Sequence, residues 1–281
     1  MNIFYEDFNL GSDRVVLFLH GWGSTSSFFR EIVPLFTDQG FRAILFDAEG
    51  QGKSEKGAPT GHLEFYRTHY RNSIVRDVFQ LLKIRGVEGR FGIVGHSLIG
   101  GGIAQLIALE NPQLVDFLIL LNTGPLIIDN PVANIFWNVL PKNVRMNYDE
   151  IFRTEGLLDE IIEKTFPFIR MAIMDEIKKA RKSDEKLRFP PHQELRALIF
   201  ENIRALFDAP LPSSKITCPT LVVGCELDNF APVQMARELA ELIPNATYRE
   251  IDMAGHFGPS QRWEELGTFV DEFFRDLVPS G

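Results

Sequence analysis

The sequence predicts an α/β fold in which a mostly parallel central sheet carries helices on both faces and a helical cap is inserted. Three observations predict it. Short apolar, β-branched runs alternate with helical patterns in the first half of the 281-residue chain, the same alternation returns near the C-terminus, and helical periodicity alone fills the part between. Alternation of this kind implies a parallel sheet, because each parallel connection needs a crossover.

The individual elements follow from these periodicities. The expected strands are Val15–Leu19, Ala43–Phe46, Phe91–Val94, Phe117–Leu121, Thr220–Val223 and Thr247–Ile251. The expected helices are Phe28–Thr37, Asn72–Ile84, Gly101–Glu110, Val233–Leu242 and Glu264–Asp276.

The part between the two alternating regions is expected to form the helical cap. It covers residues 126–211, and the sheet core consists of residues 1–125 and 212–281. Because open α/β sheets bind ligands at the carboxyl ends of their strands, a cap there would enclose a pocket. A separate helical domain is the alternative, which is disfavoured because Cys218–Val223 resumes the sheet without a linker.

Composition excludes several classes of protein. The net charge of −9 argues against general nucleic-acid binding. The N-terminus lacks the features of a secretory signal, and no apolar run reaches the length of a membrane span. Two cysteines, Cys218 and Cys225, are too few for a disulfide scaffold, which favours free thiols and a cytoplasmic protein. Histidine spacing predicts no metal site, and no dinucleotide-binding motif or other cofactor signal is present.

The segment from Gly92 to Gly102 carries the most informative motif. An apolar run meets Gly95-His96-Ser97, and a glycine-rich, apolar helix start follows. This is the layout of a nucleophile elbow, a sharp strand-to-helix turn that exposes a serine hydroxyl. The segment therefore predicts an activated serine at position 97.

Two further residues complete a catalytic set with this serine. Ser97, Asp228 and His256 each stand shortly after an expected strand, in this chain order. A serine hydroxyl is a weak nucleophile, so a histidine must accept its proton and a carboxylate must orient the imidazole. Each residue alone has an ordinary structural explanation as a turn, cap or loop residue, but the three together at matching strand ends favour catalysis.

Two backbone amides are candidates for stabilising an oxyanion. The turn His20-Gly21-Trp22-Gly23 ends an early strand and can direct the amide of Trp22, while the amide of Leu98 lies at the start of the elbow helix. A tight turn that needs its glycines is the structural alternative for the first motif. The glycine-rich turn Asp47–Ser54 is interpreted as structural.

With these motifs the chain resembles the serine hydrolases of the α/β-hydrolase fold. The resemblance rests on the two turns above, the elbow, Glu226-Leu227-Asp228 and Gly255-His256-Phe257, and it spans residues from about 15 to 275. It implies that Ser97 is the nucleophile, His256 the general base and Asp228 the acid that orients it. Dehalogenases and epoxide hydrolases of this fold carry an aspartate at the elbow, so Ser97 disfavours them.

The sequence departs from the family pattern near two turns. Glu49 stands where many members carry arginine, and Ile99 stands where the last glycine of G-x-S-x-G belongs. The residues after Ile99 fall one place later than the family's usual spacing, which indicates a one-residue insertion. An extra residue turns a helix by about 100° unless a local bulge absorbs it. We expect a bulge at Ile99–Gly102 that leaves Ser97 in place.

The predicted function is hydrolysis of carboxylic esters of small to medium acyl substrates through an acyl-enzyme. An apolar pocket supports it, and its candidate lining residues are Trp22, Phe28, Leu98, Phe136, Trp137, Phe166 and Phe257. The alternatives are a carbon–carbon bond hydrolase, lactonase or thioesterase on the same triad, or a ligand-binding protein with an impaired elbow.

A macromolecular partner is a further possibility at the expected cap. The His20–Gly23 turn resembles that of the pimeloyl-carrier-protein methyl esterases, and the cap stretch Arg170–Arg188 is basic in an acidic protein. This stretch could receive an acidic carrier protein, whereas a solvated helix face with internal ion pairs is the simpler interpretation.

Overall fold

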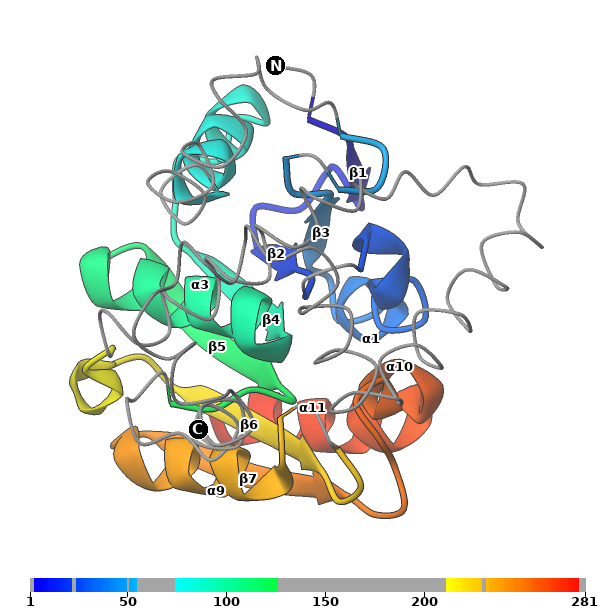
Figure 1. The fold of residues 1–281 in the computed structure, drawn as a ribbon. Coiled ribbons are helices and arrows are strands. Elements are labelled where there is room, and N and C mark those ends of the chain that lie inside the picture. The colour runs from blue at the N-terminus through cyan, green and yellow to red at the C-terminus, as the bar shows by residue number, and fades with distance from the viewer. Residues whose placement is uncertain are drawn as a thin grey trace, which may run out of the picture.

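The core of the molecule is a twisted, seven-stranded sheet in the order β1-β3-β2-β4-β5-β6-β7 (Figure 1). The computed structural model describes residues 3–21, 24–49, 51–54, 74–125, 211–228 and 231–277. Its strands are β1 (Tyr5–Phe8), β2 (Val15–Leu19), β3 (Arg42–Phe46), β4 (Phe91–His96), β5 (Val115–Leu121), β6 (Thr220–Cys225) and β7 (Ala246–Ile251). Only β1 pairs antiparallel, along β3 at the edge of this sheet.

The two expected halves of the core form one continuous sheet. Strand β5 from the first half pairs in parallel with β6 from the second, with Leu118 opposite Thr220 and Leu121 opposite Val223. The strand predictions are confirmed to within two residues at each end. The expected cap lies outside the described residues up to Pro210, so its boundaries stay a prediction.

Helices cover both faces of the sheet, as the alternation predicts. One face of the sheet is covered by the helix of residues 74–84, by α3 (Ser97–Glu110) and by α9 (Val233–Leu242) (Figure 1). The other face is covered by α1 (Pro34–Thr37) and α11 (Trp263–Leu277). Three short elements complete the described set: the 3-10 helices η1 (Ser26–Phe29) and η2 (Ser213–Lys215), and α10 (Gly258–Gln261). No helix in the described ranges is long and apolar enough to cross a membrane.

The strands alternate between two apolar cores. In β2, Leu17 and Leu19 belong to the core under α3 and α9, while Val16 and Phe18 belong to the core under α1 and α11. All five residues of β2 are buried, which is the pattern of a parallel strand covered on both sides. Burial on both faces therefore explains why the central strands read as continuous apolar runs.

The predicted helix Phe28–Thr37 is wrong as a single element. The chain forms η1, a turn, and then the short helix α1, which begins at Pro34. Proline has no amide hydrogen and disfavours a helical conformation in the residue before it, so it stands at a helix start rather than inside one. The apolar periodicity survives this break, because Phe28, Phe29 and Phe36 are all buried in the same core.

Candidate active site

The elbow serine lies at the junction between strand β4 and helix α3. Strand β4 ends at His96 and α3 begins at Ser97, with no loop between them. Ser97 has a φ of 65°, in the left-handed region that a residue with a Cβ seldom adopts. Such a conformation costs on the order of 1–3 kcal/mol and persists only where its surroundings enforce it. The predicted strained turn is present at this position.

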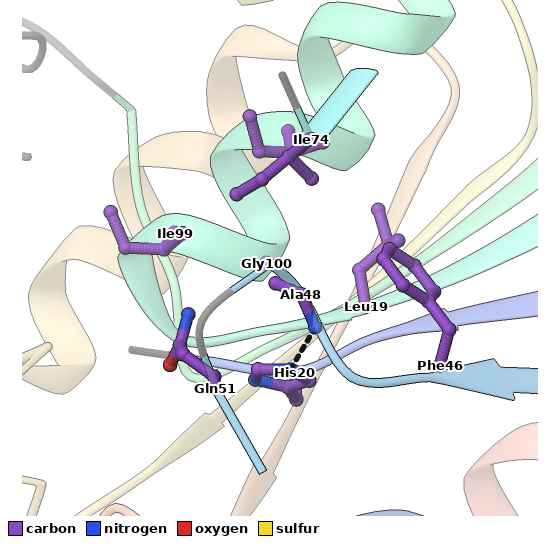
Figure 2. Close-up of a pocket in the computed structure, with 9 residues that line it drawn as sticks. Leu19, His20, Phe46, Ala48, Gln51, Ile74, Ile99 and Gly100 are labelled. Atoms are coloured by element: carbon purple, nitrogen blue, oxygen red, sulfur yellow. Dashed lines mark hydrogen bonds between the residues drawn. The ribbon is translucent and has the colours of Figure 1, made fainter. Parts of the chain in front are cut away.

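The predicted bulge at Ile99–Gly102 is wrong, and the physical reason is the position of Gly100. Helix α3 runs without interruption from Ser97 to Glu110. A Cβ on Gly100 would lie 2.1 Å from the carbonyl oxygen of Leu19, so this glycine makes the close backbone approach to the end of β2. The side chain of Ile99 instead lines a small hollow beside Ile74 and Ala48 (Figure 2). The helix start predicted at Gly101 is also wrong, because α3 begins four residues earlier, at Ser97.

The loop after β2 lies directly against Ser97. A Cβ on Gly21 would lie 2.6 Å from the Cβ of Ser97 and 3.2 Å from its hydroxyl oxygen, so only glycine fits there. The amide hydrogens in the first turn of a helix have no intrahelical acceptor, which leaves that of Leu98 directed out of the start of α3. Of the two candidate oxyanion donors, Leu98 is placed beside Ser97, and Trp22 lies outside the described residues.

Asp228 and His256 form a buried pair. The Nδ1 of His256 lies 2.7 Å from Asp228 Oδ2, and both side chains are at least nine-tenths buried. Because the carboxylate only accepts, Nδ1 carries the proton in this bond, which leaves Nε2 as the acceptor in the neutral ring. The backbone amide of Ala231 donates to the other oxygen, Asp228 Oδ1, at 2.9 Å and fixes the carboxylate plane.

Two residues that the sequence reasoning missed connect this pair to the elbow. The carbonyl oxygen of His256 accepts from His96 Nε2 at 3.0 Å and from Asn122 Nδ2 at 2.8 Å. His96 immediately precedes Ser97, and the rings of His96 and His256 have centroids 4.7 Å apart. The pair of Asp228 and His256 is therefore linked to the residue that precedes Ser97, and all three predicted residues follow the carboxyl ends of parallel strands. The three residues were predicted because each is a polar residue shortly after a strand. Asn122 could have been predicted in the same way, since it is the polar residue directly after β5.

Backbone strain concentrates at this edge. Within the described ranges, four residues other than glycine have positive φ, and three of them are Ser97, Asn122 and Met253. They follow strands β4, β5 and β7, and Met253 belongs to the loop that carries His256. Strained residues cluster at functional sites. The positions of these three residues therefore support a site at the carboxyl ends of the parallel strands.

The buried thiol nearest the site is unsuited to act as the nucleophile. Cys225, at the end of β6, is free and fully buried, and burial raises the pKa of its thiol to about 12. Cys218 is also free and buried, with a pKa raised to about 11 for the same reason. Both thiols stay protonated at neutral pH, whereas a reactive cysteine needs the thiolate. In the described part of the chain, no three His, Cys, Asp or Glu side chains gather as a metal site.

Two of the candidate pocket residues lie beside the histidines. The ring of Phe28 stacks on His96 with centroids 4.0 Å apart and an interplanar angle of 20°. Phe257 has its ring centroid 5.6 Å from that of His256 and 6.2 Å from that of Phe28. Phe28 is buried and belongs to the core, while Phe257 is half-buried. The other candidates, Phe136, Trp137 and Phe166, lie outside the described residues.

The turn after β3 connects to the site through a buried histidine. His20 Nδ1 donates to the carbonyl oxygen of Gly21 at 2.7 Å. The backbone amide of Ala48 donates to His20 Nε2 at 3.0 Å (Figure 2). Burial lowers the pKa of His20, which keeps this ring neutral and able to make both bonds. His20 therefore joins the Asp47 turn to the loop that faces Ser97.

The charge reversal at Glu49 is accompanied by a cation from the neighbouring helix. Arg76 Nη2 lies 3.8 Å from Glu49 Oε2 and 3.2 Å from Asp77 Oδ1. Both carboxylates are buried, whereas the side chain of Arg76 is half-exposed. An arginine side chain is thus present in this region although Glu49 stands where many members of the family have one.

Known proteins share this fold over nearly the whole chain. A 2-hydroxy-6-oxononadienedioate/2-hydroxy-6-oxononatrienedioate hydrolase of Cupriavidus pinatubonensis is 26% identical over 269 residues, which cover 94% of this chain and 86% of the relative. A meta-cleavage product hydrolase from Pseudomonas fluorescens IP01 superposes with a TM-score of 0.68 at 22% identity, covering 98% of this chain and 95% of the other. A thermophilic esterase from Thermogutta terrifontis gives 0.64 at 21% identity, covering 98% and 93%.

The family model described as the alpha/beta hydrolase fold matches residues 14–261. This range includes the elbow, the Asp228–His256 pair and the loop that faces Ser97. The relatives of this chain include hydrolases, and the sheet and helices of the chain have the arrangement that the sequence predicted. The chain belongs to the α/β-hydrolase fold family.

Proposed function

We propose that this protein is a serine hydrolase that cleaves carboxylic esters of small to medium acyl substrates through an acyl-enzyme. One arrangement supports the proposal: Ser97, with a φ of 65°, directly follows His96, and His96 binds the backbone of His256, whose Nδ1 lies 2.7 Å from a carboxylate. A serine becomes a strong nucleophile when a histidine accepts its proton and a carboxylate orients that histidine.

The chemistry assigns one role to each group. Ser97 Oγ attacks the ester carbonyl while His256 Nε2 accepts the hydroxyl proton, and Asp228 stabilises the imidazolium that forms. The oxyanion lies at the start of α3, where the Leu98 amide and the helix dipole favour negative charge, with the Trp22 amide as the second donor. The protonated His256 then gives its proton to the leaving alcohol, and water deacylates Ser97 by the reverse sequence.

The pocket and cap belong to the same proposal. Phe257 and Leu98 lie beside the pair and the nucleophile, and an apolar acyl group suits such a lining. The predicted cap of residues 126–211, with Phe136, Trp137 and Phe166, would close the pocket. The reaction as written needs no metal or other cofactor.

A carbon–carbon bond hydrolase on the same triad is the second candidate. The Cupriavidus relative is named for a substrate that carries an oxo group and two carboxylates and no ester, so its hydrolysis must break a carbon–carbon bond. At 26% identity over 94% of this chain, that relative makes the candidate worth testing directly. The third alternative, a ligand-binding protein with an impaired elbow, rested on a predicted irregularity after Ser97. That irregularity is absent from α3, which runs from Ser97 to Glu110.

Labelling with a fluorophosphonate tests the nucleophile. Wild type should label once per chain and hydrolyse p-nitrophenyl esters, and the chain-length optimum sizes the acyl pocket. Ser97→Ala should abolish both. Asp228→Asn should lower kcat by about 10⁴-fold with the fold intact, because the histidine loses its orienting carboxylate. Ser12 lies in the turn before β2, whereas Ser97 follows the end of β4. Ser12→Ala is therefore the matched serine control and should label fully.

The same proteins distinguish the two candidates. Hydrolysis of a 2-hydroxy-6-oxo-dienoate with a higher kcat/KM than any ester would favour the carbon–carbon bond hydrolase. Labelling that persists in Ser97→Ala would reject the proposed mechanism for both.

A further inference from the structure

The backbone of His256 is bound by two neutral donors from different strands. The carbonyl oxygen of His256 accepts from His96 Nε2 at 3.0 Å and from Asn122 Nδ2 at 2.8 Å, and the same Asn122 nitrogen lies 3.3 Å from the carbonyl of Gly255. His96 ends β4 and Asn122 follows β5, so the loop that carries the base is attached to the ends of two adjacent strands. A carbonyl oxygen only accepts, so His96 carries its proton on Nε2.

The surroundings of His96 keep it in this single protonation state. Its side chain is fully buried, and the ring of Phe28 stacks on it with centroids 4.0 Å apart. Among the described residues, its Nδ1 has no hydrogen-bond partner and no carboxylate pairs with it, and the titratable groups that act on it are His256 and His20. Burial lowers the pKa of His96 well below its usual value, with His256 acting in the same direction. His96 therefore remains a neutral Nε2–H donor.

Asn122 is held for the same task by an unusual backbone. Its φ is 48°, a conformation that asparagine tolerates better than most residues. Its backbone N–H donates to the carbonyl oxygen of Val223 at 2.8 Å. That bond fixes the end of β5 against β6, and the side chain then reaches the carbonyls of Gly255 and His256.

We propose that His96 and Asn122 are positioning residues that set the separation between Ser97 and His256 by holding the backbone of the base. The inference rests on the proposed function. Because His96 is covalently next to Ser97, its bond to His256 joins nucleophile and base without using either reacting side chain. A neutral donor suits this place, because a charged neighbour would oppose the imidazolium that forms on His256 during acylation.

A pair of variants separates this role from simple packing. In His96→Gln the side-chain nitrogen stands the same number of bonds from the backbone as His96 Nε2 and can donate. His96→Met has the same length and no donor. Loss of the tether should lower the fluorophosphonate labelling rate of His96→Met by about 10- to 100-fold, since a displacement of about 1 Å at a reacting group has effects of that size. His96→Gln should stay within about threefold of wild type.

Asn122, the second donor to the carbonyl of His256, gives a further test of the same tether. Asn122→Gly adopts the left-handed turn at little cost and removes the donor without adding a charge, so its labelling rate should also fall. Equal labelling rates for His96→Met, His96→Gln and wild type, or equal losses in His96→Met and His96→Gln, would overturn the proposal.

A measurement on wild type avoids any question of variant folding. Long-range nitrogen–proton NMR should show His96 as a neutral Nε2–H ring that does not titrate between about pH 5 and 9. An Nδ1–H ring or a titrating His96 would overturn the tether. If wild type fails to react with the fluorophosphonate, the proposed function fails, while the NMR result still decides the state of His96.

Discussion

Two glycine-containing turns leave the strands on either side of β2, and they differ in where they place their strain. In the turn after β3, Gly52 takes the positive φ of 55°, and the carboxylate of Asp47 accepts from the amides of Ser26 at 2.7 Å and Lys53 at 2.8 Å. In the turn after β4, the positive φ belongs to Ser97, and the preceding His96 keeps a buried nitrogen without a hydrogen bond.

The difference separates a structural turn from the turn that carries the proposed nucleophile. Glycine adopts positive φ at little cost, so a turn with no other duty uses it, as at Gly52. A Cβ at Gly52 would lie 2.1 Å from Asp47 Oδ2, which shows how closely that turn folds around its own carboxylate. Strain left on a residue that carries a hydroxyl, as at Ser97, indicates that the side chain is needed there. Variants of the two turns should therefore fail in different ways.

The largest loss of stability is expected from Asp47→Ala. The change leaves the amides of Ser26 and Lys53 without their acceptor in a buried turn, and hydrogen bonds to a charged group contribute about 1.5–3 kcal/mol each. We expect the free energy of unfolding to fall by about 3 kcal/mol, measured by urea denaturation. The activity of each folded molecule should change far less.

Lys53→Ala is the control for this prediction. Its backbone amide still reaches Asp47, so its unfolding midpoint should stay close to that of wild type. A loss below about 1 kcal/mol in Asp47→Ala would mean that this turn does not depend on its carboxylate, and the contrast with the elbow would disappear.

A smaller effect, of opposite sign, is expected at the elbow. Ser97→Gly and Ser97→Ala both remove the proposed nucleophile, but only glycine relieves the φ of 65°. Ser97→Gly should be the more stable of the two by about 1 kcal/mol, which corresponds to a Tm about 2–4 °C higher. Calorimetry of the two inactive variants measures this directly. Equal melting temperatures would show that the elbow stores no strain, and the argument from strain to function would fail.

The contrast between the turns also shows what the sequence could predict of the fold. The central strands were predictable because burial on both faces makes each one a continuous apolar run, as in β2. The edge strand Tyr5–Phe8 was not, because it is partly exposed and is held by partners distant in sequence. Arg42 from β3 donates to Asp7 at 2.9 and 2.7 Å across 35 positions, a contact that no local pattern reveals.

The candidate site was predictable to the same limit. Ser97, Asp228 and His256 stand after strands, and parallel strands end at one edge, so their proximity followed from the fold class. The bulge was predicted wrongly because a motif spacing cannot say which glycine makes the close contact; Gly100 does so in place of residue 99. The tether through His96 and Asn122 depends on side-chain reach between strand ends, which only coordinates show.

The smallest effect is expected beside Glu49, where the structural turn meets a second buried carboxylate. Among the described residues Asp77 Oδ2 has no hydrogen-bond partner, and burial raises the pKa of Asp77 above its ordinary 3.8 although Arg76 opposes the shift. A raised pKa in the folded state means that folding favours the protonated acid. The stability therefore falls as the pH rises from about 3.8 through the folded pKa, and the loss stays constant above it. Asp77→Asn removes that cost and should raise the Tm by about 1–3 °C at pH 7. Near pH 4 the difference from wild type should shrink, as thermal melts across this range would show. An Asp77→Asn protein less stable than wild type at pH 7 would instead make the Arg76 ion pair the dominant interaction of this carboxylate.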